Sequence, residues 1–319
     1  MTGAIAPSPN EKASSKGFEM EFGQWCMRAT LDIIGIAGLG RDFHSLQNSK
    51  DPLVEKYQRI LEPDKEKLTW FGLSVVFPQW IINRLPWHIN TELTNIQNDL
   101  HEFAMQNVRD RRAELAKEKT SGTASATTVS GDPTAATGDR NDILSLLVRS
   151  NDFTDHELAE QTLTMMAAGH ETTSSALSWC AYLLAKNPEL QTKVRDEVRQ
   201  ALPSPDSGVP ITADMIDKLT YLNAVCLETT RLYPTVPVTI REVIRDTPLG
   251  GRMIPKGTVV QLAPWAINRS EHFWGKDADE FRPERWINDD GSTNKNGGSS
   301  SNYAQLTFLH GPRSCIGQG

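Results

Sequence analysis

The run of ten residues from Phe308 to Gly317 constrains this chain more than any other stretch. It reads F-x-x-G-x-R-x-C-x-G, with Gly311, Arg313 and Cys315 at its fixed positions. A nearby cation and backbone N–H groups favour the thiolate form of a cysteine, which is the form that binds metals. The glycines let the backbone come close to a flat ligand. The run therefore predicts a loop that presents a metal-binding thiolate; the alternative is a structural cysteine buried in a turn.

Composition limits the classes of protein to which the chain can belong. Its 319 residues are 38% hydrophobic and 23% charged, which is a globular composition with enough residues for a substantial core. The net charge of −7 gives no indication of nucleic-acid binding. The other cysteines, Cys26, Cys180 and Cys226, form no C-x-x-C pair, so their spacing indicates neither a zinc site nor a redox dithiol.

Two segments are predicted to be disordered from their composition. Residues 1–16 are polar and rich in small residues, and they do not form a signal peptide. Residues at about 120–140 are rich in Ser, Thr and Gly and contain almost no large apolar side chains. No stretch of about 18 apolar residues is present, so the sequence predicts no transmembrane segment and, as given, a cytoplasmic chain.

Most of the chain is predicted to be helical, with a small β component. The best-defined helix begins at a capping box made by Thr154 and Glu157 and ends before Pro188. It would span roughly 33 residues, or about 50 Å. Short β-rich runs are predicted at 238–244 and 258–262. Further helices are predicted at 18–38, 51–70, 91–119, 142–149, 188–202 and 214–233.

The middle of the long helix carries the segment A-G-H-E-T-T, which begins at Ala168. Glycine and threonine have low helix propensity, so their presence at the centre of a helix suggests a function other than helix formation. Gly169 removes side-chain bulk where a large planar ligand could lie. Thr172 can form a hydrogen bond beside the acid of Glu171, and together they could deliver protons. The alternative is a helix with a polar face, and His170 is assigned no role.

A third pattern is made of charged residues. Glu228 and Arg231 lie three residues apart and therefore on one helical face. Such a pair alone carries little meaning, because exposed helical ion pairs are common and weak. Further along the chain, Pro283 and Glu284 precede Arg285 in a P-E-R segment.

Taken together, these segments resemble the cytochrome P450 superfamily of heme-thiolate monooxygenases, with features of a eukaryotic, fungal member. The resemblance implies a P450 fold that is incomplete, with the N-terminal lobe and the C-terminal helix absent, and a single domain at 17–319. It also implies that full-length relatives are often anchored to the endoplasmic reticulum membrane. The heme b site that it implies has Cys315 as the iron ligand, with Arg313, Arg241, Phe308, Gly311 and Gly169.

The same resemblance implies roles for the other motif residues. Glu171 and Thr172 would be catalytic and assist the protonation of oxygen. Glu228, Arg231 and Arg285 would form a buried charge triad behind the heme, where the loss of one member leaves a buried charge without its partner.

The activity that the resemblance implies is the hydroxylation or epoxidation of a small apolar substrate, such as a lipid or a secondary metabolite, with O2. An NADPH-dependent reductase would supply electrons, because the chain has no flavin or nicotinamide fingerprint. One alternative is a heme-thiolate isomerase or dehydratase that does not use O2, against which the Glu171 and Thr172 pair argues. The other is a truncated remnant without activity.

Overall fold

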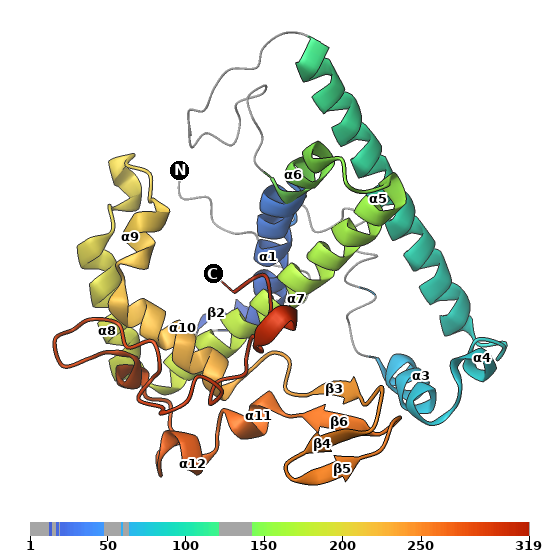
Figure 1. The fold of residues 1–319 in the computed structure, drawn as a ribbon. Coiled ribbons are helices and arrows are strands. Elements are labelled where there is room, and N and C mark those ends of the chain that lie inside the picture. Colours follow the sequence, from blue (N-terminus) through green and yellow to red (C-terminus); the bar gives the residue numbers. More distant parts are fainter. Residues whose placement is uncertain are drawn as a thin grey trace. The chain divides into compact units, whose positions relative to one another are not determined.

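The computed structural model describes residues 13–14, 17–18, 20–47, 59, 64–120 and 142–318. The described residues are mainly helical, and their strands form small sheets, which confirms the predicted fold class (Figure 1). Contacts divide the chain into two compact units, Met1–Glu171 and Thr172–Gly319. The insertion predicted at about 120–140 lies outside the described residues except for Thr120. The assignment of 17–319 to one domain stays a prediction.

The first unit is built almost entirely of helices. Of the helix predicted at 51–70, the structure describes Arg59 and the residues from Asp64 onward, where the Asp64 carboxylate accepts a bond from the backbone N–H of Lys67 and begins a helix. The elements are, in order, β1 (Ala13–Ser14), β2 (Gly17–Phe18), α1 (Phe22–Leu39), α3 (Lys65–Val76), α4 (Gln79–Ile82), α5 (His88–Thr120), α6 (Ile143–Ser150) and the first part of α7 (Asp155–Lys186).

Two groups of buried apolar side chains hold α7 in the first unit. One group joins α7 to α1 and α5 through Met166, Leu31 and Leu100. The other joins the first turns of α7 to α5 and α6 through Leu158 and Val148. Burial of this apolar area is the main term that favours the packed helices over the unfolded chain.

The ends of α7 confirm the sequence prediction. The Glu157 carboxylate accepts bonds of 2.8 Å from both the backbone N–H and the hydroxyl of Thr154. These two bonds lower the pKa of Glu157. The Thr154 hydroxyl in turn accepts the N–H of Glu157 at 3.3 Å, which completes the capping box. At the other end, α7 stops at Lys186, and Pro188 begins the next helix.

The second unit combines short helices with two small sheets. Its elements after α7 are α8 (Pro188–Ala201), η1 (Pro205–Ser207), α9 (Ala213–Asp217), α10 (Thr220–Leu232), β3 (Thr239–Glu242), β4 (Thr247–Leu249), β5 (Arg252–Ile254), β6 (Val259–Leu262), α11 (Pro264–Ile267), α12 (Glu271–Trp274), η2 (Pro283–Trp286) and η3 (Gly311–Arg313). Its apolar core gathers Trp274 and Trp286 around Ala224 of α10.

The prediction of one helix at 214–233 is wrong, because the segment forms α9 and α10. The carboxylate of Glu197, on α8, accepts the backbone N–H groups of Tyr221 and Leu222 at 2.8 Å each. A helix start leaves N–H groups without an intrahelical partner, and a carboxylate satisfies them. The acceptor comes from a different helix, so no local signal predicted this break.

The two predicted β-rich runs pair with each other. β3 and β6 are antiparallel, and Thr239 lies opposite Leu262. Between them, β4 and β5 form a hairpin whose turn residues Gly250 and Gly251 have φ of 59° and 77°. Positive φ at both turn positions is the conformation for which glycine is suited. Among the described residues, no helix is long and apolar enough to cross a membrane.

Candidate functional site

The run around Cys315 forms an exposed loop of the second unit. Two backbone bonds close it: Cys315 N–H donates to the Phe308 carbonyl at 2.9 Å, and Ser314 N–H donates to the Gly311 carbonyl at 3.0 Å. Gly311 has a φ of 79°, which a residue with a side chain rarely adopts. The loop thus turns sharply twice and leaves the Cys315 side chain at the surface.

The surroundings of the Cys315 sulfur fit the cysteine ligand of heme b. The backbone N–H of Gly317 donates to the Cys315 Sγ at 3.4 Å. Phe308, at the start of the run, is half-buried, while Arg313 is exposed at the end of η3. A cysteine sulfur is the protein ligand of heme-thiolate iron, and hydrogen bonds to that sulfur tune it.

The other cysteines are less suited to bind a metal. Cys26 is buried in α1. Burial raises the pKa of Cys180, although the nearby Thr229 hydroxyl opposes the shift. Burial of the thiol and the nearby Cys180 raise the pKa of Cys226 to about 11, although the residue as a whole is exposed. A raised pKa keeps a thiol protonated, so Cys315 remains the best candidate.

The predicted charge residues Glu228, Arg231 and Arg285 meet in one buried network. Both carboxylate oxygens of Glu228 accept bonds of 2.8 Å from the Arg231 guanidinium, and Oε1 also accepts Arg285 Nε at 2.8 Å. Trp286 Nε1 donates to Oε2 at 2.9 Å. The remaining Arg231 protons go to backbone carbonyls, those of Asn268, Ala278 and Glu280. The network is therefore completed by hydrogen bonds within the second unit.

Glu284 lies next to this network in the sequence but points to the surface. Its carboxylate accepts bonds from Lys193 Nζ at 2.7 Å and from the Tyr221 hydroxyl at 2.8 Å. Burial tends to raise the pKa of Glu284, but these two bonds outweigh burial and lower it. Within the P-E-R segment, Glu284 thus links α8 to α10 at the surface. Arg285 belongs instead to the buried network.

Asn268 is a functional candidate that the sequence did not reveal. Its side-chain oxygen accepts the Leu306 N–H at 2.8 Å, and its amide donates at 3.0 Å to the Arg231 carbonyl and to the Thr307 hydroxyl. Thr307 also donates to the Thr230 carbonyl at 2.8 Å. Leu306 and Thr307 lead into the Cys315 loop, so Asn268 connects the charge network to that loop.

No sequence signal could have identified Asn268 as a link. It begins the triplet Asn268-Arg269-Ser270, which reads as a glycosylation acceptor. Its side chain is fully buried, with 0% exposed, so the folded chain cannot present it for that modification.

The division of the chain into two units falls within the motif on α7, between Glu171 and Thr172. A Cβ on Gly169 would meet Ile34 Cδ1 at 2.8 Å, so close packing of α1 explains this glycine. The space beside Gly169 is therefore filled by Ile34, and its role at the heme stays a prediction. Glu171 is exposed and Thr172 is half-buried.

His170, which had no assigned role, is fully buried at the same contact with α1. The Thr30 hydroxyl donates to the His170 carbonyl at 3.1 Å. Burial lowers the pKa of His170, while the nearby Met27 backbone opposes the shift. The imidazole is consequently favoured in its neutral form.

The two predicted propionate ligands are both exposed in the second unit. Arg241, on β3, donates to the Thr239 hydroxyl at 3.0 Å and to the Ile240 carbonyl at 2.7 Å. Within the described part of the chain, neither Arg241 nor Arg313 takes part in an ion pair. Both guanidinium groups could therefore bind a carboxylate.

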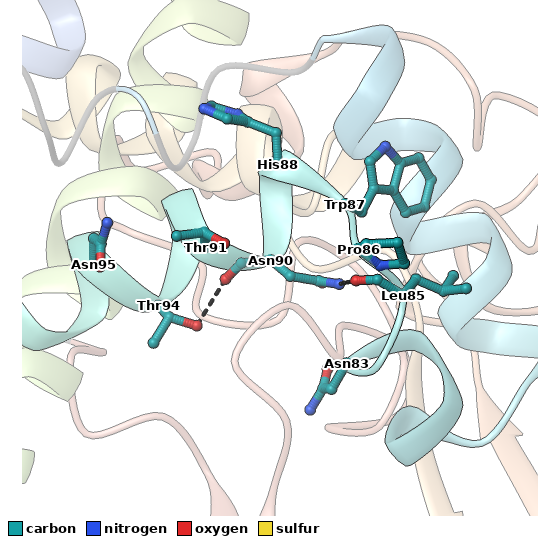
Figure 2. Close-up of a pocket in the computed structure, with 9 residues that line it drawn as sticks. All are labelled: Asn83, Leu85, Pro86, Trp87, His88, Asn90, Thr91, Thr94 and Asn95. Atoms are coloured by element: carbon teal, nitrogen blue, oxygen red, sulfur yellow. Dashed lines mark hydrogen bonds between the residues drawn. The ribbon is translucent and has the colours of Figure 1, made fainter.

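A pocket in the first unit lies apart in the sequence from all of these residues. Its volume is about 560 Å³, and it is lined at the α4–α5 connection by residues between Asn83 and Asn95 (Figure 2). The Asn90 side-chain amide donates a hydrogen bond to the Leu85 carbonyl at 3.0 Å (Figure 2). The Asn90 backbone carbonyl accepts a hydrogen bond from the Thr94 hydroxyl at 2.7 Å, and together these bonds hold the connection (Figure 2). None of the predicted site residues lines this pocket, so we assign it no part in the site.

Comparison with known proteins gives a match along nearly the whole chain. The family model described as Cytochrome P450 matches residues 8–319. Cytochrome P450 monooxygenase sphH of Aspergillus fumigatus is 41% identical over 297 residues, which cover 92% of this chain and 51% of that protein. FUM15 of Gibberella moniliformis, also a cytochrome P450 monooxygenase, is 34% identical over 355 residues, covering 98% of this chain and 56% of that protein. The chain therefore spans about half the length of the curated relatives that it matches.

Proposed function

The chain belongs to the cytochrome P450 family, and from this premise we propose that its protein is a heme-dependent monooxygenase. The family is heme-thiolate, with heme b held by a cysteine ligand to its iron. The observation that carries the proposal is the exposed Cys315 sulfur with the Gly317 N–H directed at it. The proposed reaction is hydroxylation or epoxidation of a small apolar molecule with O2.

Cys315 is proposed as the iron ligand, and its loop as the proximal wall of the heme. Phe308 would keep water away from the sulfur, because it is half-buried and its carbonyl is bonded to the Cys315 N–H at 2.9 Å. Arg313 and Arg241 would bind the propionate carboxylates, for which a planar guanidinium is well matched. When bound, heme b supplies the redox chemistry that amino-acid side chains lack.

Glu171 and Thr172 are proposed to hold and pass on the protons that the reaction consumes. A carboxylate and a hydroxyl at neighbouring positions can relay a proton to a reacting group. The exposure of Glu171 supports this role, because an exposed acid can exchange protons with water. The packing of Gly169 against Ile34 supports it indirectly, since close contact with α1 fixes the helix just before the pair.

The buried network and Asn268 are proposed to position the ligand loop. Glu228 holds Arg231, whose carbonyl accepts the Asn268 amide, and Asn268 binds the backbone of Leu306. A side chain whose own bonds are all satisfied by buried partners is held in one position. The thiolate would thus be placed before heme binds, with little cost in ordering the loop.

The substrate class and the electron donor are part of the same proposal. The relatives are named as cytochrome P450 monooxygenases, which supports an oxygen-dependent reaction. We assign a secondary metabolite or lipid as substrate and an NADPH-dependent reductase as the partner that supplies electrons. An isomerase or dehydratase would not need the acid and hydroxyl pair on α7.

The test uses the full-length protein with heme and a compatible reductase. The reduced, carbon-monoxide-bound protein should show the red-shifted Soret band of a thiolate ligand, and Cys315→Ser should abolish it. Cys226→Ser and Cys180→Ser are matched controls that should keep the band. Loss of the band in a control variant, or its survival in Cys315→Ser, would refute the ligand assignment.

A second measurement tests the reaction class. Thr172→Ala should retain heme and the band, while electrons from NADPH go into peroxide instead of product. Product formed without O2 would identify an isomerase or dehydratase. Unchanged coupling in Thr172→Ala would remove the hydroxyl from the mechanism.

A further inference from the structure

Three side chains of types that can bind metal ions come together in the first unit, away in sequence from every motif of the heme site. His101 lies on α5, and His156 and Glu160 lie on the first turns of α7. One ligand atom from each lies within 4.8 Å of those of the other two. His101 Nδ1 is 3.1 Å from Glu160 Oε1, and the two imidazole rings lie 5.3 Å apart.

The arrangement follows from the helical repeat. His156 and Glu160 are four residues apart, so they lie on one face of α7 and can bind the same ion. Burial of apolar side chains such as Val108 and Leu158 between α5 and α7 supplies the contact that brings His101 to that face. Because both helices are anchored by this core, their backbones already bring the three side chains close together.

From this cluster we infer that His101, His156 and Glu160 bind a divalent transition-metal ion of the zinc class. Two imidazoles and one carboxylate form a ligand set that Zn²⁺ uses with a water at the fourth position. With bonds of about 2.0–2.1 Å, neighbouring ligands of a tetrahedral zinc lie roughly 3.3 Å apart. The 3.1 Å contact already meets this distance, and the other separations need a shift of at most an ångström or two. Mg²⁺ and Ca²⁺ prefer oxygen ligands and would not select two imidazoles.

A second histidine and glutamate pair on α5 shows what an incomplete site looks like. His88 Nδ1 lies 3.9 Å from Glu92, also four residues away, but Arg59 Nε binds the same carboxylate at 2.9 Å. A guanidinium on the carboxylate competes with a cation, and among the described residues no third metal ligand joins this pair. His88 is therefore a matched control for His156.

The bound ion would join the middle of α5 to the first turns of α7. An ion that binds only the folded protein stabilises it by an amount that rises with the logarithm of the ratio between its concentration and the dissociation constant. α7 later carries Glu171 and Thr172, so the cross-link would fix the start of the helix that holds them. The site would be structural, since none of its residues is assigned to the reaction.

The test measures zinc directly on the full-length protein. The zinc content of the natural protein and of His156→Ala is measured by elemental analysis after equilibrium dialysis against Zn²⁺. The natural protein should hold one zinc ion per chain more than His156→Ala. His156→Ala and Glu160→Gln should each lower the zinc affinity at least about tenfold. Both side chains are exposed, so these variants should fold; their helical circular dichroism checks this. His88→Ala should bind zinc like the natural protein.

Thermal unfolding provides a second readout that does not depend on enzyme activity. Zn²⁺ at a hundredfold excess over its dissociation constant should raise the midpoint by several degrees, and Mg²⁺ should not. The shift should vanish in His156→Ala and persist in His88→Ala. Equal zinc binding by the natural protein, His156→Ala and Glu160→Gln would mean adventitious zinc only and would overturn the inference, as would the absence of zinc binding.

Discussion

The network around Glu228 and the loop that carries Cys315 are both attached to α10, yet they differ in what completes them. Glu228 and Arg231 are fully buried, and their charges meet partners from the same chain. Cys315 and Arg313 are exposed, and their chemistry is directed outward. Asn268 connects the two regions. Stability is thus concentrated in the network, whereas the loop keeps its functional groups free of core packing.

The largest effect on stability is expected from Glu228→Gln, which removes the anion between two buried guanidinium groups. Breaking a buried ion pair leaves a charge without compensation, at a cost of about 3–5 kcal/mol in the free energy of unfolding. Urea denaturation of the full-length protein measures this change. The exposed Glu242→Gln is the control and should stay within about 0.5 kcal/mol. Equal effects would show that the network is not the stability centre of the second unit.

A smaller effect is expected from Asn268→Ala, which breaks the connection between the two regions. The change leaves the Leu306 N–H and the Arg231 carbonyl without their buried partner, at a cost of about 1–3 kcal/mol. Heme occupancy, measured together with urea denaturation, should fall because the loop loses its anchor. The exposed Asn296→Ala should change neither quantity. Full heme occupancy in Asn268→Ala would show that the loop holds its position without the network.

His170 should contribute a pH-dependent part of the stability. Burial lowers its pKa below the ordinary value of 6.5, so the unfolded chain binds a proton more readily than the folded chain. The free energy of unfolding should therefore fall as the pH drops below 6.5, and it should stay level above that value. His170→Leu should remove this loss, whereas the exposed His272→Gln should keep it. Denaturation midpoints between about pH 5 and 8 provide the measurement.

The smallest effect on stability is expected from Cys315→Ser, although it should abolish the thiolate-type Soret band. The side chain is exposed, and substitutions at such positions usually change the free energy of unfolding by less than about 0.5 kcal/mol. Urea denaturation without heme isolates this effect. A large loss of stability would mean that the sulfur belongs to the core of the second unit, against the comparison drawn above.

The features that the sequence determined by itself are those encoded within a few residues. Thr154 and Glu157 specify the start of α7, and Pro188 specifies its end, because caps and proline act on the backbone beside them. The residue types from Phe308 to Gly317 likewise carry the chemistry of the loop, since a thiol, a cation and two glycines are needed there whatever surrounds them.

The tertiary structure alone decided which distant residues complete these local features. Glu197 caps the start of α10, so α9 and α10 are separate where the sequence predicted one helix. Ile34 fills the space beside Gly169. Asn268 binds residues that are 37 and 38 positions away, and His101 meets Glu160 from another helix. Such partners are chosen by the packing of helices against one another, and the contribution of a hydrogen bond or of a tight apolar contact exists only once that packing has brought the two groups together.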